Sequence, residues 1–283
     1  MVVIDSNLAD LTIWTYTHLS SRGLGKMRAQ WKYLSPEVHD SLINQLSNIS
    51  VMSGQSLSMT VIGLSKLGVT WDSLSPKCRL TLQRGFPSPI QSSEQIVANV
   101  VHSFGIMGVN YAEDLDDETK SKITNSFISV ASTFTGQGLS NTMYGWAKMG
   151  YQFEQWPENV HIAWESAFFS LSSPCSISRM RDQSVSNSIW SLGQCGAAWI
   201  SQSSSFPTAG RYMLTSTSCS MICRAIESNI VQMTEQGFSN TLMGLAKVCR
   251  DTPLDVHPHP KSSPHPKVYA LDPIFSNMLS FML

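Results

Sequence analysis

The stretch that decides the fold is "QGLSNTMYGWAKMG", residues 137–150. Its apolar residues Leu139, Met143 and Trp146 recur every three or four positions, which is the spacing of one face of an α-helix. The opposite side is polar. The stretch therefore predicts an amphipathic helix that buries one face and leaves the other for solvent or a ligand.

Five copies of this phrase occur along the chain. The clearest are "QSVSNSIWSLGQCG" at 183–196 and "QGFSNTLMGLAKVC" at 236–249. With the asparagine of the first phrase as position 0, the copies are anchored at Met59, Asn99, Asn141, Asn187 and Asn240. The anchors are about 40 to 53 residues apart, a spacing that suits units of two helices and excludes a heptad or collagen-like period.

Each position of the phrase predicts a structural role. Positions −2, +2 and +5 are apolar in all five copies and should form the buried face. Position +4 is Gly or Ser and position +6 is Ser, Gly or Ala, so a neighbouring helix could approach closely there. Glycine at +9 predicts a helix that ends in the left-handed conformation; these glycines are Gly68, Gly108, Gly150 and Gly196.

The spacers between copies should each carry a second helix, because acidic or proline starts precede apolar residues at helical spacing. The predicted second helices are 75–86, stopped by prolines at 87 and 89, then 117–134, 157–171 and most of 211–232. The Ser-rich 201–210 is predicted to be a loop.

The fold class predicted is all-α, a right-handed α-solenoid of helix-turn-helix repeats of about 40–50 residues. The expected organisation is a degenerate N-terminal repeat or cap at 1–50 with Leu11 as its anchor, the array at 51–252, a Pro/His-rich linker at 253–267 and a short helical segment or truncated unit at 268–283.

The composition gives no sign of a polyanionic partner, a CxxC site or a membrane span. Nineteen basic and twenty acidic residues give a formal charge of −1, so the net charge does not favour a polyanionic partner. The six cysteines form no CxxC pair, and no uninterrupted apolar run is long enough to span a membrane. No targeting peptide is visible in this chain.

The phrase S-N-x-φ-φ-G-φ-A-K-φ-G, where φ is apolar, resembles the first-helix signature of the octotricopeptide repeat. It is also similar to the helical repeats of the FAST-kinase-like and heptatricopeptide organellar proteins. The resemblance covers residues 55–252. It implies an α-solenoid that binds single-stranded RNA in mitochondria or plastids and acts in transcript stability, processing, translation or ribosome assembly. RNA-processing or ribosome-assembly proteins are the partners it implies. The longer spacers of this chain depart from a regular one-repeat-one-base array.

Positions −4, 0, +3 and +7 fall along one stripe of each first helix, separate from the apolar face. Amides can pair with base edges, aromatic rings can stack on bases and lysines can meet phosphates. The RNA-binding candidates are therefore Lys66, Gln95, Asn99, His102, Gln137, Asn141, Tyr144, Lys148, Gln183, Asn187, Trp190, Gln236, Asn240 and Lys247.

A structural role is the alternative at each of these positions. The anchoring asparagines can form a ladder of hydrogen bonds between helices, the glutamines can face solvent or cap the helix, and Tyr144 and Trp190 can pack between neighbouring helices. For the whole protein, a protein-binding solenoid without RNA contact is the alternative to an RNA-binding one.

Neither catalysis nor a cofactor is expected. The sequence lacks the short motifs of hydrolases, nucleotide-binding loops and zinc proteases, and it pairs no carboxylates for acid–base work. The acidic stretch 112–118 has no calcium-loop spacing and is predicted to be a polar turn leading into a helix. The histidines at 257, 259 and 265 alternate with proline, and a dedicated metal site is not expected there.

Overall fold

The computed structural model describes residues 30–172, 180–199 and 213–249. These residues are predominantly helical, which confirms the all-α class. One pair of two-residue strands, β1 (Ala198–Trp199) and β2 (Met213–Leu214), runs parallel. The helices are α2 Pro36–Ser47, α3 Gly54–Leu67, α4 Pro76–Arg84, α5 Glu94–Met107, α6 Asp117–Val130, α7 Gly136–Lys148, α8 Glu158–Ser172, α9 Asp182–Gln194, α10 Ser216–Asn229 and α11 Glu235–Cys249.

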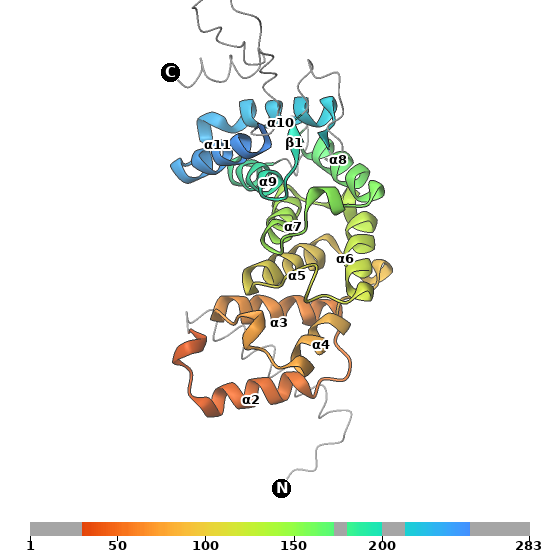
Figure 1. The fold of residues 1–283 in the computed structure, drawn as a ribbon, viewed down its shortest axis with the longest axis vertical. Helices are drawn as coiled ribbons and strands as arrows, with labels where there is room; N and C mark the ends of the chain where they lie inside the picture. The colour runs from red at the N-terminus through yellow and green to blue at the C-terminus, as the bar shows by residue number, and fades with distance from the viewer. Residues whose placement is uncertain (1–29, 173–179, 200–212, 250–283) are drawn as a thin grey trace, which may run out of the picture.

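The helices pack in two layers, which Figure 1 shows side by side. Each copy of the repeated phrase forms a first helix, and the first helices α3, α5, α7, α9 and α11 pack against one another in chain order. The second helices form the other layer, in which α2 contacts α4, α6 contacts α8 and α8 contacts α10. The gap between the short α4 and α6 is filled by the 3-10 turn η3 (Pro89–Gln91), which packs on α6.

The second helices predicted from the spacers are confirmed as α4, α6, α8 and α10. One boundary differs, because Met213 and Leu214 pair with β1 before α10 begins. The helix α2 was not predicted from the sequence. Its start carries the same Ser-Pro pair as α4, since Ser35 and Pro36 correspond to Ser75 and Pro76, and this signal could have identified it.

First helices end as the glycines at +9 predict. All four glycines have positive φ, between 73° and 80°. In each case the next residue donates its N–H back into the last turn, for example Val109 N to Phe104 O at 3.0 Å and Tyr151 N to Trp146 O at 3.0 Å. The chain therefore leaves every one of these helices in the same direction.

Four of the five first helices begin with a Ser or Thr cap at position −6, and α9 has Arg181 there without a side-chain cap. Ser53, Ser93, Thr135 and Thr234 each accept a hydrogen bond from the backbone N–H three residues later. The glutamines at −4 are exposed and follow the cap by two residues. Solvent exposure is thus confirmed for these glutamines, and the capping role considered for them is wrong.

The buried face is the one that the repeat predicts. Positions −2, +2 and +5 are at most 4% exposed in the first four copies. Trp146, at +5 of α7, packs its ring against Phe127 of α6 at 4.6 Å and against Trp156 at 4.9 Å between centroids. First-helix residues thus fill the core together with the second-helix layer.

Small residues bring neighbouring first helices into backbone contact, as positions +4 and +6 predict. A Cβ on Gly145 would collide with the Val101 carbonyl and lie 2.8 Å from the His102 nitrogen. A Cβ on Gly105, at +6 of the preceding helix, would lie 2.7 Å from the Gly145 oxygen. The α9–α11 pair repeats this arrangement, since a Cβ on Gly244 would lie 2.5 Å from the Ile189 oxygen.

Several sequence expectations lie outside the described residues. These are the copy anchored at Leu11, the Ser-rich stretch 201–210, the linker 253–267 and the segment 268–283. Within the described ranges, no helix is long and apolar enough to cross a membrane.

Replacing Gly145 by Ala should destabilise the chain by about 1–3 kcal/mol, because the added methyl group must push α5 and α7 apart. The matched control is Ser103→Ala at position +4 of α5, which is also buried but already carries a Cβ, so this change adds no atom to the helix contact and should cost less stability than Gly145→Ala. Urea unfolding of both variants measures the difference, and equal stabilities would contradict the backbone contact.

Candidate nucleic-acid interface

The predicted stripe lies on one face of successive first helices. The glutamines at −4 are exposed in all five copies, and the anchors at 0 are partly buried. At +7, Lys66 and Lys148 are exposed and Lys247 is partly buried. The packing of α3, α5, α7, α9 and α11 in chain order therefore brings the candidate residues of separate units onto one continuous face.

The side chains at +3 stack on one another across three helices. The His102 and Tyr144 rings lie 5.6 Å apart between centroids with 29° between their planes. Tyr144 and Trp190 lie 5.1 Å apart with 27° between their planes. All three rings are partly buried, and together they form an aromatic ladder that we define as His102, Tyr144 and Trp190.

The ladder limits how a base could bind. Tyr144 lies on the middle helix, between a ring from α5 and a ring from α9, so both of its faces are already in contact. A base could stack on Tyr144 only by displacing one of these neighbours. The interhelical packing considered for Tyr144 and Trp190 is what the structure contains, and ring edges are what the ladder offers to a ligand.

Lys148 is placed beside the ladder. Its Nζ lies 5.6 Å from the Tyr144 ring centroid and 5.5 Å from that of Trp190. Both distances are within the range of a cation–π interaction, which holds an exposed ammonium group over the rings. Lys148 therefore combines a fixed position with an exposed charge, as a phosphate contact requires.

One of the anchoring asparagines, Asn99, makes the hydrogen bond between first helices that a structural role for these residues predicts. Asn99 donates from Nδ2 to the Ser58 Oγ of α3 at 3.1 Å. The serines in the matching places for Asn187 and Asn240 are Ser140 and Ser186, which donate to carbonyls of their own helices. Within the ranges that the structure covers, Asn99 alone of the anchors bonds to the preceding helix, so the ladder is discontinuous.

Burial sets the charge of the histidine in the ladder. It lowers the pKa of His102 below the ordinary value of 6.5, because the charged imidazolium loses solvation against the neighbouring rings. His102 is therefore neutral at physiological pH, and the positive charge along the stripe comes from the lysines at +7.

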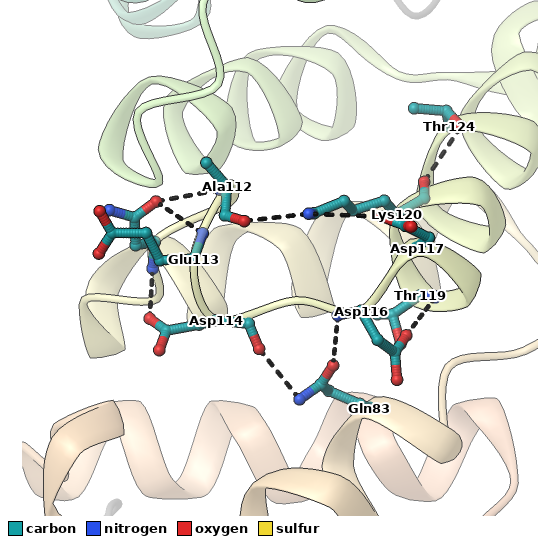
Figure 2. Close-up of polar contacts among 10 residues, drawn as sticks. Gln83, Ala112, Glu113, Asp114, Asp116, Asp117, Thr119, Lys120 and Thr124 are labelled. Carbon is teal, nitrogen blue, oxygen red and sulfur yellow. Dashed lines mark hydrogen bonds and ion pairs between the residues drawn. The ribbon is translucent and has the colours of Figure 1, made fainter.

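The acidic stretch 112–118 is a structural turn, drawn in Figure 2. Asp116 caps α6 by accepting the Thr119 N–H at 2.7 Å, and this hydrogen bonding lowers the pKa of its carboxyl group. Lys120 donates to the Ala112 carbonyl at 3.0 Å. Among the described residues, no group of three or more His, Cys, Asp or Glu side chains could hold a metal ion.

Gln83 of α4 connects this turn to the preceding unit (Figure 2). Its Nε2 donates to the Asp114 carbonyl at 3.1 Å, and its Oε1 accepts the Asp116 N–H at 3.0 Å. The side chain is buried, and its amide group pairs with two backbone groups of the turn. Gln83 is part of the contact between repeats and was not identified from the sequence.

A second feature that sequence reasoning missed is the aromatic residue at +12, which is Trp71, Tyr111 or Phe153 in the first three units. Two of these residues, Tyr111 and Phe153, join neighbouring units through the backbone. Tyr111 N donates to Met149 O at 2.9 Å and Phe153 N donates to Cys195 O at 2.7 Å. Extending the repeat alignment past +9 would have shown the signal.

Comparison of the sequence with models of known protein families and with individual curated proteins found no match. The site is therefore interpreted from its own geometry.

Replacing Tyr144 by Ala should raise the pKa of His102 toward about 6.5, because the imidazole loses the ring that shields it from water. NMR titration of the His102 ring protons measures the shift. The control is Trp190→Ala, which removes a ring stacked on Tyr144 and should move this pKa less. In the wild-type chain, the stability that the neutral ring contributes is present above pH 6.5 and is lost as the pH falls through the lowered pKa.

Replacing Gln83 by Leu should destabilise the chain by about 2–4 kcal/mol, because the Asp114 carbonyl and the Asp116 N–H are left without their partner. Denaturant unfolding measures the loss. Gln91→Leu on the exposed turn η3 is the control and should be close to neutral. A Gln83→Leu variant as stable as this control would contradict the bridging role.

Proposed function

We propose that the chain is a right-handed α-solenoid that binds single-stranded RNA along its layer of first helices. The observation that carries the proposal is the aromatic ladder on α5, α7 and α9. It lies in line with the lysines at +7 of the alternate first helices α3, α7 and α11, and Lys148 is beside two of its rings. Single-strand binding needs cationic groups in a row beside aromatic and amide groups, and this face supplies them.

Each kind of side chain has a separate part in the proposed contact. Lys66, Lys148 and Lys247 meet phosphates, one from each of three helices. The exposed glutamines at −4 reach base edges with amide groups. Tyr144 contributes its edge, because rings pack on both sides of it, whereas His102 and Trp190 each stack on Tyr144 alone among the three rings. The ladder thus serves as a rigid support for the lysines and amides.

The cellular setting follows from the resemblance to octotricopeptide and FAST-kinase-like repeats. We place the protein in mitochondrial or plastid RNA metabolism, where it would stabilise, process or help translate a transcript, or act in ribosome assembly. The balanced charge of the chain implies few phosphate contacts and therefore a shallow salt dependence.

A protein-binding solenoid is the second candidate, and the charge of the first-helix layer favours it. The first turns of α5, α9 and α11 carry Glu94, Asp182 and Glu235, which balance the three lysines of the last turns. A surface with acidic groups at one end of its helices and basic groups at the other also suits a peptide.

The triple variant Lys66→Ala, Lys148→Ala and Lys247→Ala should weaken binding of the full chain to a labelled single-stranded RNA pool. For single strands each phosphate contact makes the slope of log affinity against log salt more negative by about 0.7, so the triple variant should have a slope that is shallower by about 2. Fluorescence anisotropy over a range of salt concentrations measures both quantities.

The matched control replaces three cations of the second helices, Lys77, Lys122 and Arg224, and makes the same charge change on the other layer. Its affinity and salt slope should stay near the wild-type values. Equal losses in the two triple variants would mean that net charge, rather than the stripe, governs binding. Crosslinking in cells that recovers a protein partner and no enriched RNA would favour the second candidate.

A further inference from the structure

The last first helix, α11, exposes positions that the other first helices bury. At +2, Val61, Val101, Met143 and Ile189 are at most 1% exposed, whereas Leu242 is 41% exposed. At −2, Phe238 is partly exposed, while its four counterparts are fully buried. The face of α11 that corresponds to the core of every other unit is thus uncovered by the described residues.

In the other units this face is covered by the unit's own second helix. Trp164 of α8 donates from Nε1 to the Met143 Sδ of α7 at 3.1 Å, which places the second helix directly on position +2. The pairs α5 with α6 and α9 with α10 are also in contact. For α11, the residues in the place of a second helix lie beyond residue 249, outside the described part of the chain.

The second helices share a register of their own. Counted from the first helical residue as zero, positions +6 and +10 are buried in all five, and +4 is exposed in all five. Position +2 is buried in α4, α6, α8 and α10. The residues at +6 are Leu42, Leu82, Ile123, Trp164 and Ile222, and those at +4 are Asp40, Leu80, Ser121, Ile162 and Ser220.

The C-terminal sequence "DPIFSNMLSFML", residues 272–283, fits this register. Asp272 followed by Pro273 has the form of a helix start, with a capping residue and proline in the first turn, as Ser75 and Pro76 have in α4. Counted from Pro273, positions +2, +6 and +10 are Phe275, Leu279 and Leu283, and position +4 is the polar Asn277.

We infer that residues 273–283 form the second helix of the last unit and dock on the exposed apolar face of α11. Leu279 then packs on Leu242, in the relation that Trp164 has to Met143. The long connection from residue 250 to residue 272 is no obstacle, because α9 and α10 belong to one unit although residues 195–215 separate them. The docked helix completes a fifth unit.

The test is hydrogen–deuterium exchange of the α11 amides in the full chain. Leu279→Asp should lower their protection by about tenfold or more, the fold-change that corresponds to losing one buried leucine. Asn277→Asp introduces the same charge two residues away, at the exposed register position, and should leave the protection unchanged. Double replacement with Leu242→Cys and Leu279→Cys should form an intramolecular disulfide under mild oxidation.

Equal protection of α11 in the wild type and in Leu279→Asp would overturn the inference, since the segment would then not cover that face. Equal losses of α11 protection in Leu279→Asp and Asn277→Asp would overturn the proposed register, in which residue 279 is buried and residue 277 is exposed. Protection of α11 that rises with protein concentration, or a double-cysteine variant that crosslinks between chains, would assign the face to a second copy and would also overturn it.

Discussion

The approach of the backbones of neighbouring first helices sets the dimensions of the rest of the structure. Gly145 lies against the Val101 carbonyl and Gly244 against that of Ile189, with no room for a Cβ at either glycine. Because α5 and α7 touch through their backbones, the side chains that flank the contact are brought together as well. His102, beside Val101, reaches the Tyr144 ring for this reason. A wider spacing would separate the aromatic ladder and expose the faces of its rings.

The same spacing decides what the candidate interface can offer. The three rings lie 5.1 to 5.6 Å apart between centroids, and Tyr144, the middle one, has a ring on each side and is not open to a base. Lys148 is fixed over two of the rings while its charge stays exposed. A surface of this kind holds its cations and amides in a preset row, which reduces the side-chain entropy that a ligand has to overcome.

Contacts between units are made at three levels. First helices meet through their small residues, the segments that follow them exchange backbone hydrogen bonds such as Tyr111 N to Met149 O, and Gln83 ties α4 to the turn before α6. Each contact joins only neighbouring units, which is how stacked repeats distribute their stability along the chain. Within the described residues, α11 is the first helix that leaves its +2 side chain, Leu242, exposed.

The sequence by itself determined the first helices, the second helices α4, α6, α8 and α10, and the buried faces of the first four copies. Helical period predicted Leu139, Met143 and Trp146 as core, and glycine at +9 predicted the left-handed helix ends, because both depend on local backbone geometry. It also selected the residues of the stripe. Tertiary structure alone decided that His102, Tyr144 and Trp190 stack together, that Asn99 bonds to Ser58 and that Gln83 bridges two units. Periodicity tells which side of a helix a residue is on, but the partner of that residue depends on the distance and rotation between two helices, which no single segment encodes.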